Sequence, residues 1–288
     1  MQDYDKSKFH IEGTVLVKYT GDEADADIPD GVTKIGYDAF SGSKSLLSVK
    51  MPQSVKEIGF SAFKGCAGLT VINLSGVTSI SDEAFKWCAS LERVQFSLGL
   101  SKIGRWAFTG CTSLKSVEIP AGVSEVGFSA FSGCTALERV VLPQGINLLE
   151  DDVFSGCENL VNADIPDGIA SIGKWTFKGC KKLAAAVIPD GVTSVGEGAF
   201  RDCKSLTSIN LPDSVKSLGA WAFAGCERLE HVNLPLSVEA VGASAFSDCT
   251  KAKVVCKRKK PLFGMPKKWS RDMLGSGDKA EIIWDSGR

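Results

Sequence analysis

The sequence predicts a solenoid of the α/β type, built from ten coils of 22–23 residues. Two observations predict it. Phenylalanine recurs at intervals of 23 residues, with one interval of 22, and nine of the ten cysteines follow such a phenylalanine by three residues. Self-similarity at a period between 20 and 50 residues is typical of chains that stack one repeat on the next. The repeat phenylalanines are Phe40, Phe63, Phe85, Phe108, Phe131, Phe154, Phe177, Phe200, Phe223 and Phe246.

A short strand is expected in each repeat. In one copy Val117 and Ile119 alternate with Ser116 and Glu118, which is typical of a strand with one buried face. Pro120 ends this strand because it has no N–H for a ladder. Such a strand is expected at the equivalent position of every coil.

A short helical turn is expected around each repeat phenylalanine. Phe131, Cys134 and Leu137 recur every three residues, a spacing that fits a 3₁₀ or short α-helical turn with one buried side. The inward residues of a coil have no partners except the coils above and below it. Burial in this chain therefore depends on stacking.

The motif V-x-x-I-G-x-x-A-F-x-G-C-x-x-L-x-x-V-x-I-P resembles the repeat of the BspA-like, or Treponema-type, leucine-rich repeat family, over about residues 28 to 256. The resemblance implies a right-handed leucine-rich repeat superhelix with a parallel β-sheet on one face. Members of this family are mostly bacterial or protozoal surface and secreted proteins associated with adhesion. It therefore implies a cell-surface or secreted location and, as partner, a protein on the surface of a host or neighbouring cell.

The flanks are expected to cap the solenoid at both ends, because end coils otherwise expose their inward residues and sheet edges. Residues 1–27 are assigned to an N-terminal capping hairpin, 28–256 to the solenoid, and 257–288 to a C-terminal basic capping segment. Residues 9–19 resemble the family's entry hairpin, and Trp269 with residues 282–284 resembles its closing segment.

The repeat departs from its pattern in two places, where we expect bends or altered loops. In the copy after Phe63 one residue is lost and Ser75-Gly76 replaces the proline turn, and the next copy has Ser97 in place of the proline. Near Phe154 acidic residues replace the usual Gly-x-x-Ala entry.

The chain is poor in groups for acid–base catalysis, with 2 histidines and 3 tyrosines. His10 and His231 lie far apart, and neither has the spacing of a metal site or the context of a catalytic triad. The glycine pairs belong to repeat turns and not to a phosphate-binding loop before a long helix. We therefore predict no enzyme activity, no catalytic residue, no metal site and no cofactor.

The nine cysteines in register leave a disulfide or metal ladder open, because stacked strands lie about 4.8 Å apart, within disulfide reach. Equivalent side chains on successive coils point in parallel, however, which favours buried thiols that act as small hydrophobic groups. Cys256 is ten residues after Phe246, which we interpret as an outward strand position. It is the predicted reactive thiol.

The outward strand positions share no chemistry, and ten strands would present them on a strip about 45 Å long, enough for a protein partner. Arginine and apolar anchors are typical of interface centres. The preferred contacts are therefore Arg93, Arg139 and the small apolar patch of Val141, Ala185 and Val187. A solvated face with scattered apolar residues stays open as the alternative. The predicted contacts are Lys50, Arg93, Gln95, Arg139, Val141, Ala185, Val187 and His231.

A second ridge of aromatic residues precedes the repeat phenylalanines by two or three residues. We expect these side chains to cover the turns and not to stack on a ligand. They are Tyr37, Phe60, Trp106, Phe128, Trp175 and Trp221.

The net charge of −1 hides an uneven distribution. Residues 251–271 contain nine Lys and Arg and no acid, while the rest of the chain has 24 basic and 34 acidic residues. This basic segment suits a polyanion such as a glycosaminoglycan or an anionic surface, or the acidic start of another copy in head-to-tail self-association. No nucleic acid is expected, because there is no base-stacking motif. The predicted polyanion contacts are Lys257, Arg258, Lys259 and Lys260.

The sequence thus predicts a non-enzymatic scaffold that binds a protein partner through its sheet face, as an adhesion or recognition module at the cell surface or outside the cell. Polyanion attachment through the basic segment is one alternative. The other is an intracellular assembly component, which follows if the N-terminus is native and the chain cytoplasmic, because the opening residues lack a signal-peptide core. No apolar run reaches the ~18 residues of a membrane span.

Overall fold

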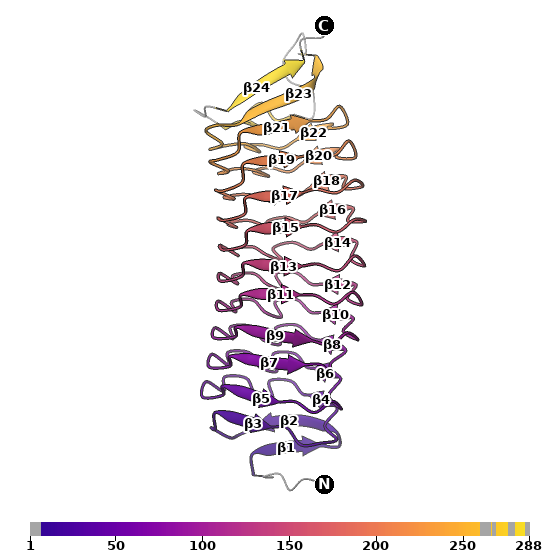
Figure 1. Cartoon of the computed structure of the whole chain (residues 1–288), viewed down its shortest axis with the longest axis vertical. Coiled ribbons are helices and arrows are strands. Elements are labelled where there is room, and N and C mark those ends of the chain that lie inside the picture. Colours follow the sequence, from indigo (N-terminus) through magenta and orange to yellow (C-terminus); the bar gives the residue numbers. More distant parts are fainter. Residues whose placement is uncertain (1–6, 260–265, 267–268, 276–279, 286–288) are drawn as a thin grey trace. The chain divides into compact units, whose positions relative to one another are not determined.

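The computed structural model describes residues 7–259, 266, 269–275 and 280–285. The chain forms two compact units, Met1–Gly145 and Ile146–Arg288. Each unit is a β-solenoid whose coils contribute strands to two faces (Figure 1). We call the face with the longer strands the front face and the other the back face.

The front face consists of parallel strands that recur every 22 or 23 residues. In the first unit they are β3 (Asp25–Asp27), β5 (Ser48–Lys50), β7 (Val71–Leu74), β9 (Arg93–Phe96), β11 (Ser116–Glu118) and β13 (Arg139–Val141). In the second unit they are β15 (Asn162–Asp164), β17 (Ala185–Val187), β19 (Ser208–Asn210), β21 (His231–Leu234) and β23 (Lys253–Lys259). These eleven strands correspond to about eleven turns, one more than the ten that the phenylalanines mark.

The back face is a second set of parallel ladders, which the sequence did not predict. Each of its strands has two residues. In the first unit these strands are β4 (Lys34–Ile35), β6 (Glu57–Ile58), β8 (Ser79–Ile80), β10 (Lys102–Ile103) and β12 (Glu125–Val126). In the second they are β14 (Leu148–Leu149), β16 (Ser171–Ile172), β18 (Ser194–Val195), β20 (Ser217–Leu218) and β22 (Ala240–Val241).

The predicted helical turns are wrong, because the described residues contain no helix. Around Phe63 the backbone alternates its hydrogen-bond partners. The N–H groups of Ser61, Phe63 and Gly65 donate to carbonyls of the next coil, at 2.8–3.1 Å. The N–H groups between them donate three residues back within the coil. A helix would direct every amide along its own axis, so this shared pattern replaces the helix and ties each coil to its neighbour.

The same turns require left-handed backbone at two points. The residue two before each repeat phenylalanine has positive φ, for example 52° at Ser61 and 57° at Trp175. The residue two after it also has positive φ and is usually glycine, as at Gly65 with φ of 70°. Left-handed residues interrupt a right-handed helix, which is the second reason why the spacing of three residues does not produce one.

Buried phenylalanine rings form the centre of each unit. In the first unit the rings from Phe40 to Phe131 stack with centroids 4.7–5.3 Å apart. In the second unit the rings from Phe154 to Phe246 stack at 5.3–5.7 Å. All ten rings are fully buried. Stacked aromatic pairs stabilise a fold by about 0.5–1.5 kcal/mol beyond area burial.

The N-terminal strands continue this stack. β1 (Phe9–Glu12) and β2 (Val15–Tyr19) form an antiparallel hairpin, and β2 pairs in parallel with β4. The rings of Phe9 and Tyr19 lie 5.1 Å apart, and Tyr19 stacks on Phe40 at 4.8 Å. Burial raises the pKa of Tyr19 to about 12, and its hydroxyl donates a hydrogen bond to Glu23.

The C-terminal residues close the other end in a different way. The N–H of Phe246 donates to the carbonyl of Met273, whose side chain is fully buried. Trp269 stacks on Trp284 at 5.9 Å, and β24 (Glu281–Asp285) pairs in parallel with β23. The carbonyl of Met273 thus accepts from Phe246 the hydrogen bond that the next coil accepts from other repeat phenylalanines, as Ala245 does from Phe223. The domain boundaries at residues 27 and 256 stay a prediction.

Replacing a stacked ring is predicted to destabilise the chain strongly. Phe63→Ala removes a buried ring that contacts rings on both sides, and such truncations cost about 3–5 kcal/mol. Phe60→Ala is the matched control, since Phe60 lies in the same coil but is 41% exposed. Its effect should stay below ~1 kcal/mol. Urea unfolding followed by circular dichroism measures both, and equal losses would contradict the stack.

Candidate partner-binding face

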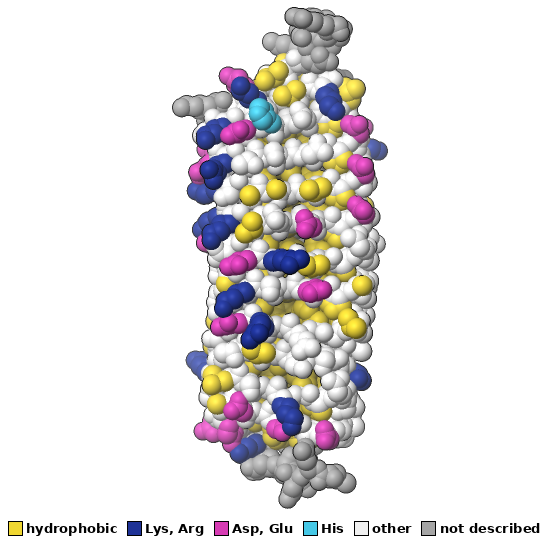
Figure 2. All heavy atoms as spheres, in the orientation of Figure 1, with side chains coloured by type: hydrophobic (Ala, Val, Ile, Leu, Met, Phe, Trp, Pro, Cys, Tyr) yellow, Lys and Arg dark blue, Asp and Glu magenta, His cyan; other side chains and the backbone are white. Residues whose placement is uncertain are grey.

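Outward side chains of the front strands form columns on the front face. Along most front strands the inward residues are buried while the residues beside them are exposed, as in the pattern of Ser116, Val117 and Glu118. The parallel register then places Arg139 beside Ser116 and Val141 beside Glu118. Charged side chains gather at the margins of this face and are sparser in its middle (Figure 2).

Five predicted contacts lie in the first unit: Lys50, Arg93, Gln95, Arg139 and Val141. Lys50 is already engaged, because its Nζ lies 2.9 Å from Asp27 Oδ2 and this carboxylate raises the pKa of the lysine. Arg93, Gln95 and Arg139 are exposed and make no ion pair with the described residues. Their donors are therefore available to a partner.

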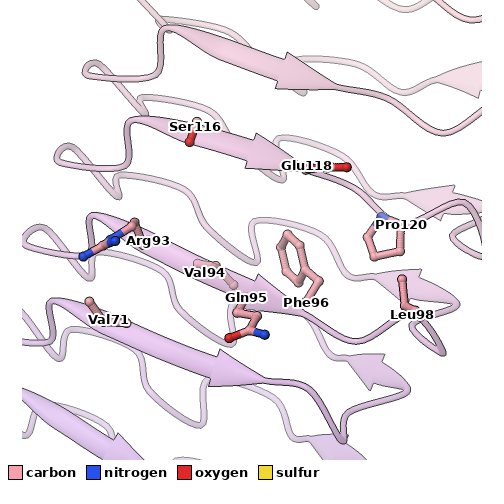
Figure 3. Close-up of a pocket in the computed structure, with 9 residues that line it drawn as sticks. All are labelled: Val71, Arg93, Val94, Gln95, Phe96, Leu98, Ser116, Glu118 and Pro120. Carbon is pink, nitrogen blue, oxygen red and sulfur yellow. The ribbon is translucent and has the colours of Figure 1, made fainter.

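A groove opens in the front face of the first unit between β9 and β11 (Figure 3). It encloses about 650 Å³. Two predicted contacts, Arg93 and Gln95, lie on it, and their neighbours complete the lining. The lining residues are Val71, Arg93, Val94, Gln95, Phe96, Leu98, Ser116, Glu118 and Pro120. The sequence predicted an altered loop here, because Ser97 replaces the repeat proline, but no function was assigned to it.

The second unit holds the other three predicted contacts. Ala185 and Val187 are the two outward residues of β17, and Val187 is 65% exposed. His231 is exposed and pairs in register with Ser208 on one side and Lys253 on the other. Unlike Ala185 and Val187, Val141 belongs to the first unit, so the structure defines the predicted apolar patch only in part.

The two histidines belong to different units. His10 lies 3.0 Å from Glu12 on the exposed hairpin, and His231 lies on the front face of the other unit. Among the described residues no group of three His, Cys, Asp or Glu side chains could hold a metal ion. The described part of the chain also has no helix long and apolar enough to cross a membrane.

The cysteines are buried thiols with a polar contact. In eight of the repeat cysteines the Sγ atom donates to the carbonyl of the repeat phenylalanine in the preceding coil, at 3.0–3.3 Å, for example from Cys66 to Phe40. Burial raises the pKa of Cys66 and of Cys134 to about 12. All ten cysteines are reduced and buried. The residue is thus a small core group that also donates a hydrogen bond.

The prediction for Cys256 is wrong. Its register partner in β21 is Leu234, which is buried, and Cys256 itself is only 1% exposed. β23 begins seven residues after Phe246, whereas β21 begins eight residues after Phe223, so counting from the phenylalanine shifted the inward and outward positions by one. Cys256 therefore belongs to the inward set.

The basic segment is described only in part. Lys257 is exposed on β23. The backbone of Arg258 and Lys259 continues that strand, while their side chains and the whole of Lys260 lie outside the described residues. The polyanion site therefore stays a prediction.

The aromatic ridge makes pairwise contacts. Tyr37 stacks on Phe60 at 5.4 Å, and Trp106 meets Phe128 edge-on at 5.3 Å. In the second unit Trp175 and Trp221 lie 6.3 Å apart. A Cβ at Gly198, between these two in sequence, would lie 2.0 Å from the Trp175 ring, so this ring covers a position where only glycine fits.

The fold and its exposed front face define a repeat protein of the solenoid class. The chain matches the family model described as BspA type leucine rich repeat region (6 copies), over residues 18–138, 62–184 and 171–258. It is 34% identical to T. pallidum leucine rich repeat protein (TpLRR), with 66% of this chain and 92% of that chain covered and a TM-score of 0.60. The chain belongs to the BspA-type leucine-rich repeat family.

Two further solved structures share the fold at lower identity. A leucine rich cell surface protein from Faecalibacterium prausnitzii is 23% identical, with 99% of this chain and 95% of that chain covered and a TM-score of 0.60. Pneumococcal vaccine antigen PcpA is 22% identical, with 91% and 69% covered and a TM-score of 0.62. No curated protein matches the chain significantly.

Stability is predicted to fall in alkali because of the cysteines. Their thiols ionise near pH 9 when unfolded, but burial raises the pKa of Cys134 to about 12 in the fold. This stabilisation is complete below pH 9 and is lost as pH rises from 9 toward 12. Cys134→Ser removes one such thiol. The free energy of unfolding of this variant should therefore fall less steeply between pH 9 and 10.5 than that of the wild type. Parallel slopes for variant and wild type in urea unfolding would refute this.

Proposed function

We propose that this chain is a non-catalytic scaffold that binds a protein partner through the front face. The observation that carries the proposal is the contrast between the two sides of each front strand. Inward positions are apolar in every coil. Outward positions change their chemistry from coil to coil, from Arg93 to Ser116 to Arg139. Packing alone does not require this variety, and variety of exposed side chains on a rigid sheet is what selective recognition needs.

A cell-surface or secreted location and a role in adhesion or recognition are part of the proposal. They are supported by the likeness in fold to the F. prausnitzii leucine rich cell surface protein and to the pneumococcal vaccine antigen. The partner we propose is a surface protein of a host or neighbouring cell. The front face offers arginine and apolar side chains, which are the types enriched at the centres of such interfaces.

The front face is tested with a double variant and a matched control. Arg93→Ala/Arg139→Ala removes two exposed cations from the front face. Arg105→Ala/Lys174→Ala removes two exposed cations outside the front strands. Full-length chains immobilised on beads are exposed to labelled surface proteins of candidate host and neighbouring cells, and captured proteins are quantified.

The expected result is capture by wild type and by the control, with at least a tenfold loss for the front-face variant. Tenfold corresponds to about 1.4 kcal/mol, within the range of one or two interface arginines. Equal capture by all three would contradict the proposal. Loss only on neutralising Lys257, Arg258, Lys259 and Lys260, together with steep salt dependence, would instead favour polyanion attachment.

A further inference from the structure

The groove between β9 and β11 is a local opening of the front sheet. β3, β5, β7 and β9 form one ladder, and β11 with β13 forms another, so no ladder joins β9 to β11. A backbone hydrogen bond of 3.4 Å from Lys115 to the Glu92 carbonyl connects the two where they begin. Beyond it the strands diverge toward their C-terminal ends (Figure 3).

The opening has a cause in the sequence. β9 ends in Phe96, where the strand of the next coil is followed by the smaller Ile119. The Phe96 ring packs edge-on against Phe108, with centroids 5.8 Å apart and an interplanar angle of 81°. The segment after β9 also lacks the proline that ends most front strands and has Ser97 and Leu98 instead. A larger ring and an altered turn hold β9 away from β11.

The opening makes core residues accessible from the front. Val94 and Phe96 occupy inward positions, yet both are only partly buried. β9 is alone among the front strands in this, as far as their residues are described. Leu98, at the mouth of the groove, is 91% exposed. An apolar floor beside an exposed leucine is a site that gains from excluding water.

The rim of the groove carries charges of both signs. Arg93 lies where β9 begins and makes no ion pair with the described residues. Glu118 lies near Pro120 at the opposite end of the groove (Figure 3). A ligand that places an acidic group at Arg93 is attracted, and one that places it near Pro120 is repelled by Glu118. The groove therefore has a polarity as well as an apolar floor.

We propose that this groove binds an extended peptide segment of the protein partner, with a large apolar side chain between Phe96, Leu98 and Pro120 and a carboxylate at Arg93. This inference rests on the proposed function of the front face. The edge of β9 that faces β11 lacks a ladder partner, so its peptide groups suit an extended backbone. A volume of about 650 Å³ accommodates a few residues and is within the range of specific sites.

The probe is a library of random heptapeptides displayed on phage, selected on the immobilised full-length chain. Enriched peptides are then synthesised and their dissociation constants measured for wild type and three variants. Arg93→Glu reverses the charge of the groove, and Leu98→Asp places a charge at its apolar mouth. Arg105→Glu is the matched control, because it reverses an exposed charge in the same unit, outside the groove and outside the front strands. All three residues are exposed, so the fold is retained and checked by circular dichroism.

The expected result is enrichment of peptides with a large apolar residue and an acid, at least tenfold weaker binding to Arg93→Glu and to Leu98→Asp, and unchanged binding to Arg105→Glu. Selection on Arg93→Glu should exchange the acid for a base. Absence of enrichment, or peptides that bind both groove variants as well as wild type, would overturn the inference. The front-face proposal would still stand in that case if Arg93→Ala/Arg139→Ala abolished capture of the surface protein.

Discussion

The stacking of each phenylalanine turn on the next is the constraint on which the rest of this structure depends. The ring of Phe63 is buried between the rings of Phe40 and Phe85, and its backbone N–H donates to the next coil. The thiol of Cys88 returns a hydrogen bond to the carbonyl of Phe63. Each coil thus needs its neighbours both to bury its apolar rings and to complete its backbone hydrogen bonds. A single coil would leave these groups without partners, which is why the repeat is kept so strictly.

This constraint leaves the outward side chains free to vary. The front strands need only one buried residue each, so Arg93, Arg139 and Val187 can differ without disturbing the core. Binding properties can therefore be placed on the front face while the stack stays the same. The groove at β9 shows the reverse relation, because there a change in the repeat itself, at Phe96 and Leu98, alters the shape of the face.

The sequence alone predicted the period, the inward residues and the front strands, because these follow from identity of residue type at fixed spacing. It did not predict the back ladders, whose two-residue strands such as Glu57–Ile58 are too short to show alternation. It favoured helical turns because a spacing of three residues cannot distinguish a helix from a turn with left-handed residues such as Ser61. It misplaced Cys256 because the register shifts where the repeat ends.

The candidate site was predicted in part. Arg93 and Gln95 were recognised as outward residues of a strand, since strand alternation shows the direction of a side chain. The groove was missed, because strand separation depends on how Phe96 packs against Phe108, which lies in the next coil. The one signal in the sequence was the missing proline at Ser97. It indicated where the repeat is irregular but did not indicate that a groove forms there.

The central claim is that the stacked phenylalanine turns stabilise the chain even where the front sheet is not fully paired, at β9. Hydrogen–deuterium exchange along the full chain tests this claim most directly. We predict strong and similar protection for the turn amides of Phe63, Phe85 and Phe108. The segment 93–99, at the open edge of β9, should exchange faster than 71–77, which contains β7 with ladders on both sides. Equal protection of these two segments, or rapid exchange at the phenylalanine turns, would contradict the account.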